Sequence, residues 1–428
     1  MSINVGSISR KPKIAILTIR NSYKYGGVFT CLKQVYKFCE KYFDPTVFYL
    51  SFDKNISANL KSFKFTSEVK NSDFEGMKSI EIGSKWAFWE PGHYVYNLSY
   101  WKKVLDGYDY FFVISGTSMA AYPLVQLSKK FPMWIAAPYL DDKSQRKDMF
   151  SGMRYLLDKL ASFKMKKIEK TILKKADFIW ALSKYTKIRF EQILQSKREN
   201  MVICNYPMEL KPIKTTVRRR KEKRIIAVGR FSDPRKNIEM LFRAFSKLYK
   251  DMPESKLYIV GSKPSEKDLL YYNFEPSFKN IIFTGSVDNN ELQKLYKQAD
   301  LMLITSYQEG LGIIALEALS YKVPVVATDC GGTRDCVIDN INGYLVKIND
   351  DEDMYKKALK ILFSKELSKK MGENGRKLVE DNFSLARIHA IFKMGLIKTY
   401  PELKSLFDQN DAVLNLNVSK TPEKVQVV

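Results

Sequence analysis

The stretch "VGRFSDPRKNIEML", residues 228–241, joins an apolar segment to a helical pattern through a tight turn that contains Asp-Pro. The β-branched run at 224–230 is typical of a buried strand. Arg230 and Lys236 would then lie at the carboxyl end of that strand, beside the start of a helix. Two cations and free backbone N–H groups hold a diphosphate well at such a place. Two solvated loop residues are the simpler interpretation of the same pattern.

The same strand–turn–helix unit recurs along the chain, which predicts an α/β protein with parallel sheets. The β-branched runs are 13–19, 46–52, 110–116, 133–137, 177–183 and 201–206 in the first half, and 224–230, 256–262, 280–287, 299–306, 324–329 and 343–347 in the second. A stretch at 207–224, rich in proline and charge, separates the two series and is interpreted as a linker. We predict two Rossmann-like doubly wound domains that face each other across a ligand-binding cleft.

A second stretch, "QEGLGIIALEA" at 308–318, places Glu309 and Glu317 eight positions apart. Gly310 and Gly312 between them allow the backbone to approach a ligand closely. At about 1.5 Å of rise per helical residue, the two carboxyl groups are expected roughly 10 Å apart. Paired glycosidase carboxylates stand about 5–9.5 Å apart. Two separate contacts with one elongated ligand therefore fit better than an acid/base pair. Each Glu taken alone also fits a structural role, at the start of a helix or on its surface.

The charge balance is the unusual part of the composition. The 428 residues carry a formal charge of +24 with an ordinary 45% of hydrophobic residues, which favours contact with nucleic acid, an anionic membrane or phosphorylated ligands. Residues 153–175 form a basic amphipathic pattern that fits either a helix on anionic lipid or a surface helix packed on its own domain. No run approaches the roughly 18 apolar residues of a membrane span, and no signal-peptide pattern precedes the first strand. We expect a cytoplasmic protein, peripheral to the membrane if the basic helix binds lipid.

Neither a metal nor a cofactor is predicted. The five cysteines are scattered without zinc-site spacing and are expected to be reduced thiols. Asp351, Glu352 and Asp353 contain the Asp-x-Asp spacing of some metal sites. They are expected to begin a helix, however, where acidic side chains favour the positive end of the dipole.

Several motifs, in order, resemble the donor half of a retaining glycosyltransferase: "GRFSDPRKN", "EGLGIIALEA", "PVVATDCGGTRDCV" and "NGYLV". The family is glycosyltransferase family four, the glycosyl transferases group 1, whose fold is GT-B. The likeness is strong over residues 224–385 and weaker in "ILTIRNSYKYGGVFTCLKQV" at 16–35. It implies an acceptor-binding domain at 1–206, a nucleotide-sugar-binding domain at 207–385, and a crossing helix with a polar C-terminal tail at 386–428.

The resemblance also implies a role for each site residue. Arg230 and Lys236 would neutralise the diphosphate of a nucleotide-sugar, and their preorganised charge would stabilise the leaving group without a metal. Glu309 would be the catalytic carboxylate at the sugar, Glu317 would hold the ribose, and Gly27 of the first domain would cap the phosphates. The donor-binding residues implied are Gly27, Arg230, Lys236, Gly310, Leu311, Gly312 and Glu317.

The sequence departs from the family pattern in the first half. The family often has a histidine within the segment that corresponds to "WIAAPYLDD" at 134–142, where Pro138 stands instead. His93, in "EPGHYVYN", fits either a catalytic or a structural role. These departures leave the acceptor, its linkage and the identity of the sugar and nucleotide open.

The expected activity is that of a metal-independent retaining hexosyltransferase in glycan biosynthesis or protein glycosylation. It would move a sugar from a nucleotide-diphosphate sugar to a glycan or lipid-linked oligosaccharide acceptor. A sugar-nucleotide epimerase on the same fold and a basic nucleic-acid-binding protein are the alternatives. The latter is less favoured because the sequence contains no recognisable module that reads nucleic acid.

Overall fold

A computed structural model of the chain describes residues 10–19, 27–53, 56–58, 67–84, 94, 96–144, 153–213, 221–266, 269–270 and 274–418. Contacts divide it into two compact units. Unit 1 comprises 1–182, 187–204 and 389–428, and unit 2 comprises 183–186 and 205–388. The segment 389–428 therefore belongs with the first half of the chain.

Unit 1 contains an eight-stranded sheet in the order β3-β4-β2-β1-β5-β6-β7-β8, in which only β3 runs antiparallel to its neighbour. Its elements up to residue 203 are β1 Lys13–Ile19, α1 Gly27–Tyr42, β2 Asp44–Ser51, β3 Val69–Phe74, β4 Met77–Gly83, α3 Leu98–Leu105, β5 Tyr110–Ser115, η2 Ser118–Ala121, α4 Tyr122–Gln126, β6 Pro132–Ile135, α5 Tyr139–Ser144, α6 Met153–Lys175, β7 Phe178–Ala181, α7 Lys184–Leu194 and β8 Met201–Ile203. The central strands read as continuous apolar runs because both faces of the sheet are covered; Ile14 and Leu17 of β1, for example, are fully buried.

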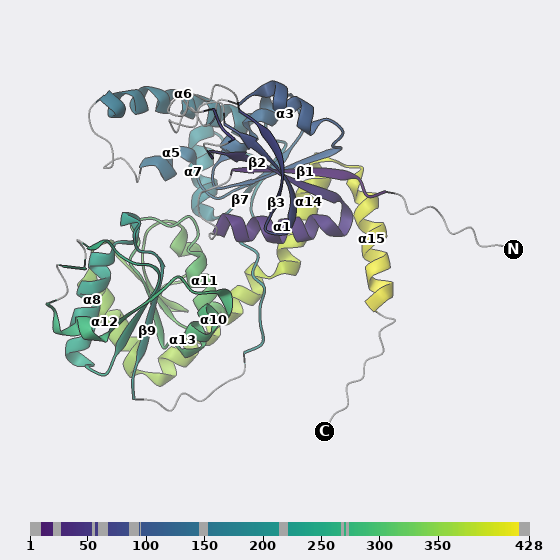
Figure 1. Cartoon of the computed structure of the whole chain (residues 1–428). Helices are drawn as coiled ribbons and strands as arrows, with labels where there is room; N and C mark the ends of the chain where they lie inside the picture. Colours follow the sequence, from purple (N-terminus) through teal and green to yellow (C-terminus); the bar gives the residue numbers. More distant parts are fainter. Residues whose placement is uncertain are drawn as a thin grey trace. The chain divides into compact units, whose positions relative to one another are not determined.

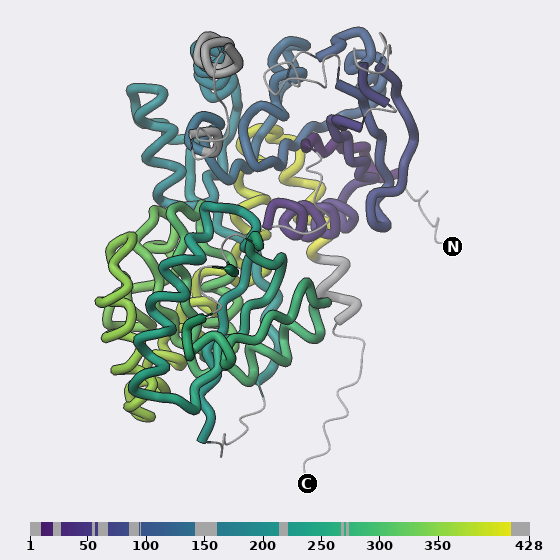
Figure 2. The backbone as a smooth tube through the Cα atoms, turned by 60° about the vertical axis from the view of Figure 1, so that its left-hand side comes forward, coloured from purple at the N-terminus to yellow at the C-terminus, as the bar shows by residue number. Residues whose placement is uncertain are grey.

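The C-terminal segment of unit 1 is more ordered than the predicted polar tail. After α14 (Leu385–Thr399), a further helix, α15 (Leu403–Val418), packs beside α1, as Figure 2 shows (yellow beside purple). The Phe407 ring meets Tyr42 edge to face at 4.9 Å, and the Tyr42 hydroxyl donates to Asp411 Oδ1 at 2.8 Å. The predicted polar tail thus contains a packed helix, because a buried Leu403 and Phe407, four residues apart, give it an apolar face.

Unit 2 contains a six-stranded, wholly parallel sheet in the order β11-β10-β9-β12-β13-β14. Its elements are β9 Arg224–Arg230, η4 Pro234–Lys236, α8 Ile238–Asp251, β10 Lys256–Ser262, η5 Pro276–Asn280, β11 Ile281–Gly285, α10 Asn289–Gln298, β12 Leu301–Ile304, α11 Ile313–Ser320, β13 Val325–Thr328, η6 Gly332–Asp335, β14 Gly343–Val346, α12 Asp351–Phe363 and α13 Lys365–Phe383. Helices α8 and α12 pack together on one side of β9, and α11 and α13 pack together on the other (Figure 1).

This strand order positions a site. The chain starts in the middle of the sheet, at β9, builds outward to β11, and then returns to place β12 on the other side of β9. In such sheets, ligands bind outside the carboxyl ends of the two strands where the order reverses. For unit 2, that point lies between the ends of β9 and β12.

Candidate active site

Lys236 and Glu309 meet at the carboxyl ends of β9 and β12. The Lys236 Nζ lies 2.6 Å from Glu309 Oε1, and the Ser306 hydroxyl donates to the same oxygen at 2.7 Å. The side chains of Lys236 and Glu309 are only 17% and 15% exposed. Because the pair is shielded from water, its electrostatic attraction exceeds that of a surface ion pair.

The surroundings of Glu309 keep its carboxyl group ionised. Burial by itself would raise the pKa of Glu309, but the Lys236 ammonium and the Ser306 hydroxyl outweigh it and hold the pKa below its ordinary value. A carboxyl group held in this form can accept hydrogen bonds or face positive charge. It is poorly suited to donate a proton as a general acid.

The turn after β9 sets the position of Lys236. Asp233 caps η4, and Asn237, which has a positive φ of 48°, ends η4 and caps α8 by accepting from Met240 N. Lys236 lies between these two caps. Its stem passes over Gly229, where an added Cβ would stand 3.4 Å from Lys236 Cε. The lysine stem therefore lies in close contact with the backbone at the end of β9.

Backbone hydrogen bonds on two sides anchor the segment that carries Glu309. Tyr307 N donates to Arg235 O at 2.8 Å, which ties the segment to the turn after β9. Glu309 N donates to Cys330 O at 3.2 Å, and Gly332 N donates to Glu309 O at 2.9 Å. The backbone of Glu309 is thus fixed between the loops that follow β9 and β13. This holds the carboxylate in position to pair with Lys236.

The Gly310-Leu311-Gly312 segment passes very close to the loop after β13. A Cβ added at Gly332 would lie 2.1 Å from Gly310 O, and Gly312 has a positive φ of 77° as the residue before α11. Leu311 is 1% exposed, and its carbonyl accepts from the Cys336 thiol at 2.8 Å. A ligand at this segment would therefore meet backbone atoms and not the Leu311 side chain.

Glu317 lies in α11, in a different environment from that of Glu309. Its Oε2 accepts from the Tyr296 hydroxyl at 2.9 Å, and the Tyr296 ring stacks on Tyr321 with 5.8 Å between centroids. Burial raises the pKa of Glu317, since its only opposing influence is that one hydroxyl. Glu309 and Glu317 thus have separate partners, and neither is hydrogen-bonded to the other.

Arg230 is more open than Lys236. Its side chain is 47% exposed and its guanidinium lies 3.8 Å from Asp233 Oδ2, whereas Arg235 approaches the same oxygen at 2.8 Å. No role was predicted for Asp233, Arg235 or Ser306. The signal for the first two was the Asp-Pro-Arg turn itself, whose acidic cap neutralises one of the neighbouring cations.

The remaining predicted residues lie on other elements or outside the part of the chain that the structure describes. Gly27 is the first residue of α1, in unit 1, and His93 lies outside the described residues. Asp351 begins α12, where it pairs with Arg243 at 2.9 Å and Lys247 at 3.0 Å. Within the described ranges, no three His, Cys, Asp or Glu side chains group closely enough to bind a metal ion.

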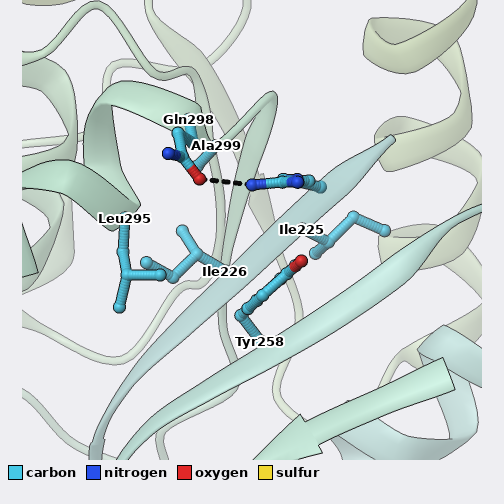
Figure 3. A pocket seen from close by; sticks show the side chains of 7 residues that line it. Ile225, Ile226, Tyr258, Leu295, Gln298 and Ala299 are labelled. Carbon is cyan, nitrogen blue, oxygen red and sulfur yellow. Dashed lines mark hydrogen bonds between the residues drawn. The ribbon is translucent and has the colours of Figure 1, made fainter. Parts of the chain in front are cut away.

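A small pocket lies at the opposite edge of the same sheet. Figure 3 shows its lining, in which Arg224, the first residue of β9, donates to Gln298 beside Tyr258. With about 10 Å³ of space, it is near the lower limit for a single water. At about 3.3 Å per strand residue, the length of β9 separates it from Arg230 by roughly 20 Å. It is no part of the ligand site at the strand ends.

Comparison with known proteins identifies the domain that contains this cluster. Residues 211–378 match the sequence pattern described as glycosyl transferases group 1. This domain belongs to that family. The group 1 domain thus contains both strand ends, the Lys236–Glu309 pair and Glu317.

Relatives of the group 1 domain are numerous and cover only part of the chain. An uncharacterised glycosyltransferase of Methanocaldococcus jannaschii is 30% identical over 237 residues, 53% of this chain and 60% of the relative. The N-acetyl-alpha-D-glucosaminyl L-malate synthase of Bacillus anthracis is 29% identical over 168 residues, 39% of this chain and 43% of the relative. The chain thus matches about half the length of these curated relatives.

Solved structures match more of the chain and show its fold. Anabaena HepE in complex with UDP-glucose aligns with a TM-score of 0.66 at 15% identity, over 90% of this chain and 99% of HepE. WaaG, a glycosyltransferase involved in lipopolysaccharide biosynthesis, aligns with a TM-score of 0.64 at 17% identity, over 91% of this chain and all of WaaG. The group 1 domain and unit 1 therefore form a GT-B-like α/β protein with two parallel sheets, and the predicted fold class is confirmed.

Proposed function

We propose that the chain transfers a sugar from a nucleotide-diphosphate sugar to a hydroxyl of a glycan or lipid-linked oligosaccharide, with retention of configuration and without a metal. The observation that supports this most directly is the Lys236–Glu309 pair at the strand ends of the group 1 domain. It puts a cation suited to a diphosphate next to a carboxylate suited to sugar hydroxyls. The HepE structure, described as a complex with UDP-glucose, supports the donor class.

In this proposal, the two partners of the ion pair divide the donor between them. The Lys236 ammonium, with Arg230 nearby, faces the diphosphate and stabilises the charge that develops as the bond to the sugar breaks. Glu309, kept ionised, accepts hydrogen bonds from the sugar and faces the positive charge on its ring. Backbone groups of Gly310, Leu311 and Gly312 line the space between, and Glu317 holds the ribose. Loss of one preorganised charge partner at such a site typically costs about 10²–10³ in rate.

The reaction can be tested by thermal-shift screening of nucleotide-diphosphate sugars, followed by NMR of the product. A donor that raises the melting temperature and yields an α-linked product from an α-linked donor supports retaining transfer. Interconversion of the free nucleotide-sugar would instead indicate an epimerase. Activity that is abolished by a chelator and restored by magnesium would overturn the metal-independent part of the proposal.

The lipid-linked acceptor is suggested by the exposed face of α6. Phe163 is 78% exposed on this helix, and Lys164, Lys166 and Lys167 beside it are exposed as well. We infer that this face binds an anionic membrane surface, where each well-placed lysine contributes about 1 kcal/mol, and that the protein works at the cytoplasmic side. Gly27, at the start of α1, would contact the donor phosphates from unit 1.

Among the described residues, no helix has the length and apolarity needed to cross a bilayer.

Binding to the membrane surface is tested by sedimentation with vesicles. Replacement of Lys164, Lys166 and Lys167 by Gln should weaken binding to vesicles containing phosphatidylglycerol. The same change at exposed Lys279, Lys294 and Lys356 of unit 2 is the control. Equal loss in both triple variants would reflect net charge alone and contradict the inference, as would tighter binding to nucleic acid than to vesicles.

A further inference from the structure

Glu169 is a buried carboxyl group that the proposed mechanism does not use. It lies in the middle of α6, on the face opposite the lysines, and none of its surface is exposed. Glutamate is rarely buried to this extent unless it is paired. Hydrogen-bond partners are therefore needed to offset the free-energy cost of removing this carboxyl group from water.

Two loops supply those partners. Glu169 Oε1 accepts from the Ser118 hydroxyl at 3.0 Å and from the backbone N–H of Tyr139 at 2.9 Å. Ser118 is the first residue of η2, which follows β5, and Tyr139 is the first residue of α5, which follows β6. Oε2 has no hydrogen-bond partner within the part of the chain that the structure describes. A single oxygen thus joins the loops at the ends of two neighbouring strands.

The loop after β6 depends on this contact at its last residue. Ala136 N donates to Ser115 O at 3.2 Å and Ala137 N donates to Gly116 O at 2.9 Å, so the loop continues the pairing of the two strands. Pro138 has no N–H to offer. Tyr139 N is the next donor along the chain, and Glu169 is the acceptor that it meets. Without this carboxylate, the start of α5 would lose a buried hydrogen bond of its backbone.

These loops lie where unit 1 is expected to bind its ligand. The chain order in its sheet reverses at β1, which lies between β2 and β5. Ligands of doubly wound sheets bind beyond the carboxyl ends of the strands at that point. The loop after β5 borders this position directly. The loop after β6 is hydrogen-bonded to the loop after β5.

We propose that Glu169 is a positioning residue for sugar transfer, which holds the loops after β5 and β6 in the arrangement that receives the acceptor. This inference rests on the proposed function, because it assumes that unit 1 binds the acceptor. Among the described residues, Asp141 on α5 and Arg189 on α7 act on Glu169 with opposite sign, and the two form an ion pair with each other at 2.7 Å. Burial raises the pKa of Glu169 to about 7, which agrees with an Oε2 atom that has no partner among the described residues.

The experiment compares Glu169→Ala, Glu169→Gln and Ser118→Ala with the wild type. Hydrogen exchange of peptides that cover residues 132–141 reports the loop. The kcat/KM for the acceptor reports transfer, and hydrolysis of the donor by water together with donor affinity reports unit 2. Glu169→Gln keeps the shape of the side chain and one acceptor oxygen, so it stays informative if the alanine variant fails to fold. Ser118→Ala removes one of the two hydrogen bonds and leaves the Tyr139 contact in place.

We expect Glu169→Ala to speed exchange at Tyr139 and to lower kcat/KM for the acceptor by about 10- to 100-fold, which corresponds to the loss of a hydrogen bond to a charged acceptor. Glu169→Gln and Ser118→Ala should show smaller losses. Donor affinity and donor hydrolysis should stay within about twofold in all three variants, because Glu169 contacts none of the residues proposed to bind the donor.

Two results would overturn the proposal alone. Unchanged exchange in folded Glu169 variants would show that the carboxylate does not hold the loop, and faster exchange with unchanged acceptor kcat/KM would reduce Glu169 to a core residue. A wild type that turns over no nucleotide-sugar, with or without acceptor, would overturn the proposed function and this inference with it.

Discussion

Glu309 and Glu169 are both shielded carboxyl groups that contact loops at the carboxyl ends of parallel strands, one in each unit of the molecule. Glu309 contacts a lysine ammonium at 2.6 Å, and its pKa is lowered. Glu169 accepts only from neutral donors, and burial raises its pKa to about 7. Burial is common to both, so the difference comes from the partner: a cation keeps the carboxylate charged, whereas neutral donors do not fully offset the loss of water.

The comparison is tested most strongly by Lys236→Ala. It removes the cation that Glu309 needs and that we propose for the diphosphate. We expect kcat/KM for the donor, measured at saturating acceptor, to fall by about 10²–10³-fold. Lys294→Ala, which changes the same charge at a 67% exposed position in the same domain, should have no effect. Equal activity in Lys236→Ala and the wild type would remove Lys236 from the donor site.

Glu169→Gln should reveal the raised pKa through stability. The folded carboxyl group titrates near pH 7 and the unfolded one near 4.5, so the wild type loses stability relative to the variant as the pH rises between these values. The loss should reach about 3 kcal/mol above pH 7, at about 1.4 kcal/mol per pKa unit. Urea unfolding of both proteins from pH 4 to 8 measures it. If the free energies of unfolding of the two proteins change in parallel over this pH range, the pKa of Glu169 is not raised by folding.

Glu309→Gln should show the opposite pH dependence. Because the folded pKa of Glu309 is lowered, its ionised form stabilises the fold above the unfolded value of 4.5, and this contribution is lost as the pH falls through the folded pKa. At pH 7 the variant should be less stable by about 1–3 kcal/mol, since Lys236 is left without its partner. The difference should vanish in acid. Glu291→Gln, whose side chain is 49% exposed, provides the control in the same domain.

The smallest effect is expected at Glu317. Glu317→Gln keeps an acceptor for the Tyr296 hydroxyl and should weaken nucleoside-diphosphate binding by about 1 kcal/mol, measured by calorimetry. Tyr296→Phe removes the partner of Glu317 without touching the ligand and separates the two contributions. A loss in Tyr296→Phe as large as that in Glu317→Gln would indicate that Glu317 acts through its neighbour and not on the ribose.

The sheet and the position of the site could be read from the sequence because of how parallel strands are built. Strands buried on both faces appear as continuous apolar runs, so β9 and β10 were predicted with their observed bounds. The ends of these strands then located Arg230 and Lys236. By contrast, β3 and β4 were missed, since β3 is a polar edge strand without such a run.

The contacts that define the site could not be read in this way. Lys236 and Glu309 are 73 residues apart, and no local pattern indicates that they form an ion pair. Glu169 is one acidic residue in a helix rich in lysine, and its burial depends on loops that are 30 and 51 residues away. The sequence predicts which edge of a sheet a residue occupies, whereas its charge state depends on neighbours that only the folded chain supplies.

The close passage between Gly310 and Gly332 has a consequence for engineering. Since any Cβ at residue 332 would lie 2.1 Å from a backbone oxygen, libraries that seek a new sugar preference would lose folded members at this position. Gly312 adds a second restricted position through its positive φ of 77°. Diversity is better introduced at side chains that reach the strand ends from outside, such as Ser232 and Ser262, whose exposed hydroxyl groups lie 2.9 Å apart. The glycines thus confine the variable part of the proposed donor site to its exposed side chains.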